Sequence, residues 1–356
     1  MKLYIHISVF IFVISILPGQ AQPIKPHDSV LRAYDGALNL LDSLIQDNGP
    51  QSFKKAVFVT ENVYLGNSLD FRAFCIKIAQ MIVLMDAWMK SNRLQNYGYA
   101  DSMNFEKNFA IFTIMKDSIK VADPEGGRVF STIPMVYDFN DYDGSRDWTK
   151  MFVSKLLYTY SGNCHSLPYL YKILADDINA SCWLALAPNH IYIENRCKKI
   201  GWYNTELTSG SFPIDGWIMA SGYLPLQAVQ NRIYMDTLSN RQSIALCMLD
   251  LAKGYEHKIH NYDDGFILKC CDLSLHYFPL NVQAILLKAE TLKRIYERQK
   301  LQKSPNAKET FRVMEQLYAR LFDLGYREMP DTMYQQWLLS VVKEKEKYNN
   351  QQLEKR

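Results

Sequence analysis

A chain of 356 residues is long enough to build two or three domains around a substantial core. Hydrophobic residues make up 48% of it and charged residues 22%, which is the balance of an ordinary globular protein. The formal net charge is only +3 and no basic stripe stands out, so we expect no nucleic-acid partner.

The amino terminus reads MKLYIHISVFIFVISILPGQA. Lys2 supplies a positive start, residues 3–17 are almost wholly apolar, and Gly19-Gln20-Ala21 has the small-x-small pattern of a signal-peptidase site. We expect a signal peptide over 1–21, cleaved near Ala21, and therefore a periplasmic or secreted protein; an uncleaved anchor is the alternative. The next apolar run, 74–89, carries charged residues, so we expect no membrane span in the mature chain.

Residues 22–107 are predicted to form an N-terminal helical segment. Apolar side chains recur at helical spacing over 30–45, Asn67-Ser68 precedes a helix over about 69–91, and 92–107 are polar and loop-like. The pattern then changes. NFAIFTIM (108–115) and RVFSTIPMVYDF (128–139) are rich in β-branched and aromatic residues, which predicts two strands with a turn at 124–127 between them.

A helix predicted over 147–160 leads to the stretch SGNCHSLPYLYKILADD, residues 161–177. Pro168 and the apolar residues around it predict a helix whose first turn carries Cys164. The positive end of a helix dipole, together with a nearby imidazole, lowers the pKa of a thiol. Cys164 is therefore a candidate nucleophile, although a small residue packed at a helix start is the alternative.

Three short strands are predicted next, over 181–188, 190–196 and 201–208. A hairpin of the last two, centred on Lys198, would place His190 opposite Glu206, with Cβ atoms roughly 5 Å apart. The acid could fix the tautomer of the ring, and the other ring nitrogen could take the thiol proton. Asn204 is the rival to Glu206 as the group that orients the histidine.

The rest of the chain is predicted as a loop-rich segment over 209–225 and a helical region over 226–356. Helical runs cover 243–256, 264–278, 280–298 and 308–324, and the last 15 residues form a charged, solvated tail. Ala245 and Ala284 are small residues 39 positions apart, and Pro279 lies between them. This rhythm resembles tetratricopeptide repeats, with a plain helical bundle as the equal alternative.

Metal and nucleotide chemistry are weakly supported. Five potential zinc ligands lie within 34 residues, namely Cys164, His165, Cys182, His190 and Cys197. No Cys-x-x-Cys or His-x-x-x-His spacing occurs among them, and the chain has no phosphate-binding glycine motif. We therefore expect neither a metal nor a cofactor. His165 is expected to be exposed or to line a cleft. The seven cysteines are an odd number, so an exported chain keeps at least one thiol unpaired within itself.

Two segments resemble the transglutaminase-like superfamily. GNCHSLPYLYKILADDINA is similar to its nucleophile helix, and HIYIENRCKKIGWYNTELT to its histidine strand, turn and acidic strand. Members read His-x-aromatic-x-acid, then Gly-Trp and Asp-Pro-Thr. The matching positions here are His190, Tyr192, Glu194, Gly201-Trp202 and Glu206-Leu207-Thr208, with Glu206 in place of Asp and Leu207 in place of Pro. The resemblance covers residues 140–215, and one branch of the superfamily carries tetratricopeptide-like helices after the core.

The resemblance implies an α+β fold. A papain-like core over 108–225, with the nucleophile helix packed on a small antiparallel sheet, would follow the N-terminal helices and precede a repeat-like helical array. It also implies acyl transfer, in which Cys164 attacks an amide of a peptide or protein substrate, His190 acts as base and Glu206 orients it. Backbone N–H groups at the helix start would hold the oxyanion. Further supporting residues are Asn163, Trp148, His165, Tyr192, Trp202 and Asn204.

Hydrolysis by such a thiol enzyme is slightly favoured over transfer to an amine. The alternative is a catalytically inactive module that binds a peptide in the same cleft. In either case the C-terminal helices would be available to recruit a protein partner.

Overall fold

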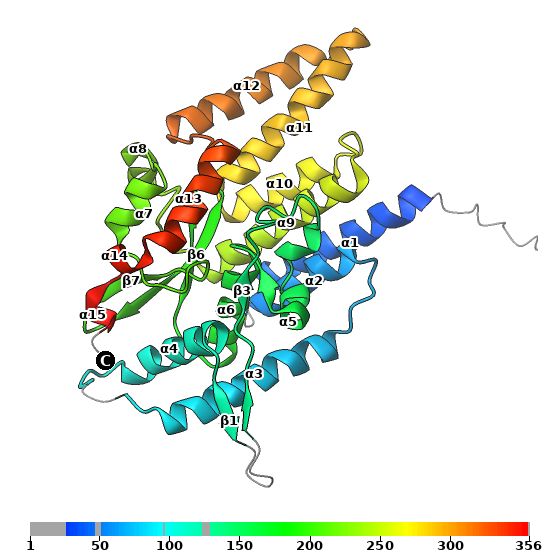
Figure 1. Ribbon diagram of the computed structural model, residues 1–356. Helices are drawn as coiled ribbons and strands as arrows, with labels where there is room; N and C mark the ends of the chain where they lie inside the picture. Colours follow the sequence, from blue (N-terminus) through cyan, green and yellow to red (C-terminus); the bar gives the residue numbers. More distant parts are fainter. Residues whose placement is uncertain (1–25, 47–50, 95–96, 123–128, 355–356) are drawn as a thin grey trace, which may run out of the picture.

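The computed structural model describes residues 26–46, 51–94, 97–122 and 129–354, which form an α+β protein of helices around small sheets (Figure 1). The predicted signal peptide lies outside the described residues. In chain order the elements are α1 (Pro26–Gln46), α2 (Phe53–Tyr64), α3 (Phe71–Ser91), α4 (Ser102–Lys116), β1 (Lys120–Ala122), β2 (Val129–Ser131), β3 (Val136–Tyr137), the 3-10 helix η1 (Trp148–Met151), α5 (Val153–Thr159), β4 (Ser161–Gly162), α6 (Ser166–Asp177), β5 (Trp183–Ala187), β6 (His190–Cys197), β7 (Gly201–Thr205), α7 (Asp215–Ser221), α8 (Leu226–Gln230), α9 (Asn240–Ile259), α10 (Phe266–Tyr277), α11 (Val282–Leu301), α12 (Ala307–Asp323), α13 (Asp331–Lys343), α14 (Lys345–Tyr348) and α15 (Gln351–Glu354).

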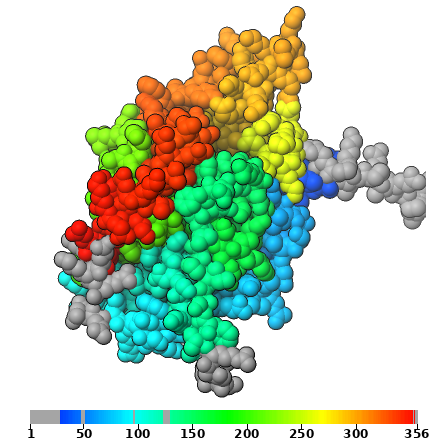
Figure 2. All heavy atoms as spheres, viewed as in Figure 1, coloured from blue at the N-terminus to red at the C-terminus, as the bar shows by residue number. Residues whose placement is uncertain are grey.

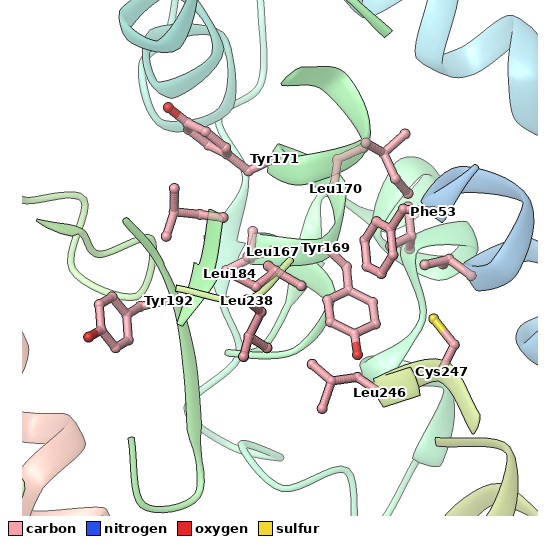
Figure 3. Close-up of a cluster of buried hydrophobic side chains, with 14 of the residues drawn as sticks. Phe53, Leu167, Tyr169, Leu170, Tyr171, Leu184, Tyr192, Leu238, Leu246 and Cys247 are labelled. Atoms are coloured by element: carbon pink, nitrogen blue, oxygen red, sulfur yellow. The ribbon is translucent and has the colours of Figure 1, made fainter. Parts of the chain in front are cut away.

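The centre of the core is helix α6 packed beside the antiparallel sheet β5-β6-β7. Leu167, Leu170 and Tyr171 of α6 are buried, and Figure 3 shows them among Leu184 and Tyr192 of the sheet. Tyr171 donates its hydroxyl to the Asn108 carbonyl oxygen at 2.8 Å, which ties α6 to α4. The predicted helix and the three predicted strands of this region are therefore present.

The strand predicted over 108–115 is wrong, because these residues belong to helix α4. Ala110, Ile111 and Met115 are fully buried, and their neighbours on the other sides of the helix are buried too. A helix without a polar face has no 3.6-residue period to reveal it, and local composition then favours a strand. The stretch 128–139 forms two short strands, β2 and β3, on either side of Pro134, which has no N–H to donate to a ladder.

In the hairpin of β6 and β7, each residue of β6 pairs two residues further along β7 than predicted. Ile193 pairs with Thr205 and Cys197 with Gly201, so the turn centres on Lys199 and not on Lys198. Gly201 has a φ of 82°, a left-handed conformation that a three-residue hairpin loop commonly needs. The glycine thus sets the turn, and the partner of every residue in the predicted pairs moves by two residues, which keeps the same side chains on each face of the hairpin.

Helices from both halves of the chain form one array. Helices α9, α10, α11 and α12 pack in succession, while α1 and α2 pack against α9 on the other side (Figure 1). Ala245 of α9 and Ala284 of α11 are fully buried at their helix contacts. Glu61 of α2 joins this array to the core, because its buried carboxylate accepts the backbone N–H groups of Val153 at 2.7 Å and Ser154 at 2.9 Å, at the start of α5.

The predicted C-terminal tail, which begins at residue 342, has exposed charged side chains but is also folded against the protein. Residues 331–354 form α13, α14 and α15; Tyr334 and Trp337, which precede the predicted tail, are buried, and within the tail Leu353 is buried. A β-bridge between Pro213 and Asn349 fixes the tail to the segment after β7, where α7 replaces part of the predicted loop. Figure 2 shows the tail (red) lying across the green core below the orange array.

Candidate functional site

Cys164 lies in the turn that joins β4 to α6. Asn163 holds this turn, since its side-chain oxygen accepts the N–H groups of His165 at 3.0 Å and Ser166 at 3.3 Å. Gly162 permits a close approach there: a Cβ atom on it would lie 2.2 Å from the Ser166 hydroxyl. The position of Cys164 therefore depends on the Asn163 side chain, which caps the start of α6, and on the absence of a side chain at Gly162.

Replacing Asn163 with Ala is expected to lower the free energy of unfolding by about 1–2 kcal/mol, because two N–H groups at the helix start lose their acceptor. Urea unfolding followed by circular dichroism measures this loss. Asn163→Ser, which keeps a capping oxygen, should lose less. Equal losses in the two variants would show that capping is not what Asn163 contributes.

His190 and Glu206 form a buried pair at the start of β6 and just beyond β7. The Nε2 atom of His190 lies 2.7 Å from a carboxylate oxygen of Glu206, and both side chains are at most 5% exposed. Continuing the observed register would put Glu206 opposite Tyr192 and diagonal to His190. The contact between Glu206 and His190 is therefore a diagonal cross-strand contact and not one between directly opposed residues. Its other oxygen accepts the Thr208 N–H at 2.7 Å, which fixes the carboxylate.

The remaining nitrogen of His190 is available to the thiol. Nδ1 is buried and makes no hydrogen bond of good geometry within the described residues. Burial raises the pKa of the Cys164 thiol, but the interaction with His190 outweighs burial and leaves that pKa below its usual value. Burial lowers the pKa of His190, while the charge of Glu206 and the interaction with the Cys164 thiol raise it to about 10. These opposite shifts favour the thiolate of Cys164 and the imidazolium of His190.

Helix α13 covers this pair. The Tyr334 hydroxyl lies 3.3 Å from the Cys164 sulfur, and the Trp337 indole meets the His190 ring edge-on at a centroid distance of 4.7 Å. The thiol also lies 3.7 Å from the Asn189 carbonyl oxygen. Burial raises the pKa of Tyr334 well above its usual value, so its hydroxyl stays protonated and can donate a hydrogen bond to a thiolate.

A cavity of about 440 Å³ opens beside the sulfur, between the core and the helical array. Cys164, His165 and His190 line it from the core, Asp250 and Gly254 from α9, and Gln283 from α11. A space of this size accommodates a peptide side chain or a small ligand.

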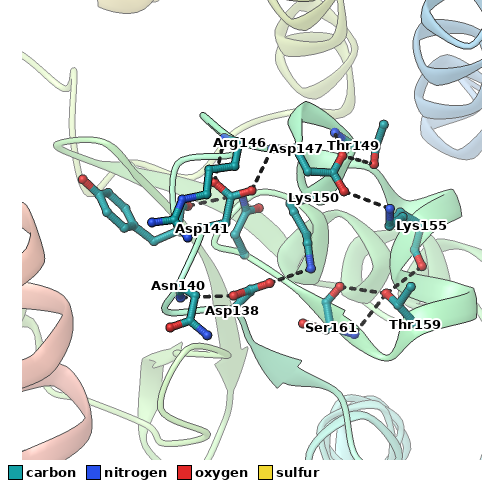
Figure 4. Close-up of polar contacts among 12 residues, drawn as sticks. Asp138, Asn140, Asp141, Arg146, Asp147, Thr149, Lys150, Lys155, Thr159 and Ser161 are labelled. Carbon is teal, nitrogen blue, oxygen red and sulfur yellow. Dashed lines mark hydrogen bonds and ion pairs between the residues drawn. The ribbon is translucent and has the colours of Figure 1, made fainter.

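The loop over 138–147 forms one wall of the cavity through Tyr142 and Asp143. Asp141 is buried within the loop and accepts the N–H groups of Arg146 at 3.0 Å and Asp147 at 2.9 Å (Figure 4). Two ion pairs reinforce it, Lys150 with Asp138 at 2.6 Å and Lys155 with Asp147 at 2.9 Å. The wall is therefore held by its own polar contacts rather than by a strand.

The other predicted supporting residues lie at different distances from the catalytic candidates, and only some of them line the cavity. Trp148 lines the cavity and stacks on His257 of α9 at 4.8 Å. Asn204 donates to the Pro213 carbonyl oxygen and to Asp215, so it holds the segment after β7 and does not contact His190. Tyr192 is buried behind the site, where its hydroxyl donates to Glu194 at 3.3 Å.

Trp202 is not part of the site. It is 47% exposed and packs against Trp183 and Arg196, outside the cavity lining. The Asn163 side chain is likewise occupied as a cap. The backbone N–H of Cys164, in contrast, donates to no acceptor in the described part of the chain. It can therefore donate a hydrogen bond to the oxyanion of a reacting substrate.

Sequence reasoning missed the residues that reach the site from far along the chain. Tyr334 and Trp337 come from the segment just before the predicted tail, and Asp250 from the predicted array. No local motif marks them, because each is one apolar or acidic position on an ordinary helix. Among the described residues, no group of three or more His, Cys, Asp or Glu side chains is placed to hold a metal ion. All seven cysteines are unpaired.

No helix in the described ranges has the length and apolar character needed to cross a membrane. In comparisons with known proteins, no family model matches the chain, and neither a curated protein nor a solved structure matches it. The chemistry of the site is therefore inferred from its own residues.

Proposed function

We propose that the protein is a thiol enzyme that cleaves amide bonds through a Cys164 thioester, with a papain-like core of the transglutaminase-like type. The observation that carries the proposal is the Cys164–His190–Glu206 arrangement beside an open cavity. The contrast with four of the other thiols supports it: burial raises the pKa of Cys182, Cys247, Cys270 and Cys271, whereas the pKa of Cys164 is lowered.

The proposed reaction has two steps. The Cys164 thiolate attacks the amide carbonyl carbon, the C–N bond breaks, and the His190 imidazolium gives its proton to the leaving amine. Neutral His190 then takes a proton from water, the hydroxide attacks the thioester, and the carboxylic acid leaves as the thiolate re-forms. The backbone N–H of Cys164 and the Trp148 indole are the candidate oxyanion donors. An amine in place of water would give transfer instead of hydrolysis.

Export by the predicted signal peptide would place this reaction in the periplasm or outside the cell. The substrate would be a peptide or protein, because the cavity is bounded by aromatic side chains that suit an unfolded segment. The array of α9 to α12 would be the surface for a protein partner.

The reactivity of Cys164 tests the proposal. Iodoacetamide labelling is followed from pH 5 to pH 10 by mass spectrometry of the cysteine peptides. We expect Cys164 to react with a midpoint below the free-thiol value of about 8.5. Cys75 on α3 is partly exposed and outside the cavity lining, so it serves as the control thiol in the same sample.

A second arm measures acyl transfer with p-nitrophenyl acetate as a generic acyl donor. Release of p-nitrophenol, acetylation of Cys164 and continued turnover are expected, with Cys164→Ala inactive and His190→Gln strongly slowed. A Cys164 midpoint no lower than that of Cys75, with no acetylation, would overturn the proposal.

An inactive binding module is the second candidate, and the cover of Tyr334 and Trp337 over the pair favours it. In that case the cavity would hold a peptide without reaction. A low alkylation midpoint combined with no acetyl transfer would support this candidate over the enzyme.

A further inference from the structure

His165, the residue after the nucleophile candidate, has both ring nitrogens bound to acceptors. Nδ1 lies 2.8 Å from the Met151 carbonyl oxygen and Nε2 lies 3.0 Å from a carboxylate oxygen of Asp250. A carbonyl oxygen can only accept, so Nδ1 carries a proton. An ionised carboxylate also only accepts, so Nε2 carries a proton too. The ring is therefore an imidazolium.

The carboxylate that holds the ring is itself fixed. The second oxygen of Asp250 accepts the Tyr169 hydroxyl at 2.8 Å, so both oxygens of this side chain are held by donors. Asp250 belongs to α9, whereas His165 and Tyr169 belong to the nucleophile helix and the turn before it. The helical array thus contributes a charge to the site directly.

Several other charged groups face this pair. Glu61 of α2, whose own pKa burial raises to about 7, interacts with the His165 ring, Lys253 of α9 interacts with Asp250, and the Cys164 sulfur also interacts with the ring. Burial lowers the pKa of His165, but Asp250, the Met151 carbonyl group and Cys164 raise it above its usual value. The charge of His165 in turn helps to lower the pKa of Cys164.

We propose that His165 is a positioning residue that supplies a permanent positive charge to the Cys164 thiolate, and that Asp250 from the helical array keeps it charged. The site then contains two histidine–carboxylate pairs with different tasks. His190 gives and takes the proton, while His165, whose two protons are both committed to acceptors, cannot. Only the catalytic use of this charge rests on the proposed function, because the charge acts on the Cys164 thiol whether or not a substrate is turned over.

The test measures the alkylation midpoint of Cys164 in His165→Gln and Asp250→Asn, with His276→Gln as the control on an exposed histidine of α10. We expect the midpoint to rise by on the order of one pH unit in the first two variants and to stay unchanged in the control. The same rise is expected when His165→Gln is added to His190→Gln, because the two histidines act independently. A purely structural role would change thermal stability without moving the midpoint.

The protonation state of the His165 ring can also be measured directly, without a variant that can fail to fold. In ¹⁵N NMR spectra of the unsubstituted protein, the His165 ring nitrogens should keep imidazolium shifts well above pH 6.5. Neutral shifts at pH 7, or a midpoint that His165→Gln and Asp250→Asn leave in place, would overturn it. Absence of acetyl transfer would instead count against the enzyme proposal and leave this result unaffected.

Discussion

Replacing Glu206 with Ala is expected to lower the free energy of unfolding by about 3–5 kcal/mol, because it leaves a buried histidine without its charged partner. The same change should slow alkylation of Cys164 at neutral pH, since His190 loses the carboxylate that raises its pKa to about 10. Urea unfolding and the labelling assay measure the two effects. Glu297→Ala, on the exposed face of α11, is the control and should change neither quantity.

The stability effect has a defined pH dependence. The pKa of His190 is raised from an ordinary 6.5 to about 10, so its contribution is complete below pH 6.5 and is lost as the pH rises through 10. Burial raises the pKa of Glu206, but His190 lowers it overall, so its contribution is present above its ordinary 4.5 and is lost as the pH falls through the lowered value. The difference between the wild type and Glu206→Ala should therefore be largest between pH 4.5 and 6.5. A difference that grows steadily toward pH 10 would contradict the charged pair.

Replacing Tyr334 with Phe is expected to raise the alkylation midpoint of Cys164 by about one to two pH units. The variant removes the hydroxyl 3.3 Å from the sulfur, and a hydrogen bond to a charged group contributes about 1.5–3 kcal/mol, at about 1.4 kcal/mol per pH unit. Tyr296→Phe on α11 provides the matched control. A midpoint that does not move would show that the hydroxyl does not donate to the thiolate.

Removing the whole Tyr334 side chain separates the effect of its hydrogen bond from its effect on the access of reagent to the Cys164 sulfur. Tyr334→Ala should raise the midpoint as Phe does, but it should also increase the limiting alkylation rate at high pH, because the ring no longer covers the sulfur. An equal limiting rate in Phe and Ala would mean that reagent reaches Cys164 through the cavity and not past α13.

The sequence was sufficient to predict the centre of the protein, because its patterns there are local. The apolar spacing after Cys164 and the alternation along β6 both indicated side chains on one face, and the structure brings Cys164, His190 and Glu206 together, although Cys164 lies just before α6 and not in its first turn. The hairpin turn was predicted one residue away, which displaces each cross-strand partner by two residues, since the left-handed Gly201 was not used to place the turn. Glu206 still reaches His190, because Glu has one methylene more than Asp.

Other features could not be predicted because they depend on distant packing. Helix α4 is buried on nearly all sides and so gives no amphipathic period. Tyr334 and Asp250 reach the site from helices that are 170 and 86 residues from Cys164 in the chain, and neither carries a motif. The packing of the C-terminal segment through Tyr334, Trp337 and Leu353 could not be predicted, because these few buried positions stand among exposed charged residues.

The packing of α1 and α2 against α9 has a consequence for biosynthesis. These two helices leave the ribosome early, yet α9, against which both pack, follows only after about 180 further residues, as the 187-residue separation of the Thr60–Cys247 contact shows. Until then α1 and α2 have mainly each other and the smaller contacts of α2 with α5 and α6, so part of their apolar faces stays uncovered and newly made chains need a holding chaperone or rapid completion. A fragment that ends before α9 should aggregate even though it contains the whole Cys164–His190–Glu206 arrangement.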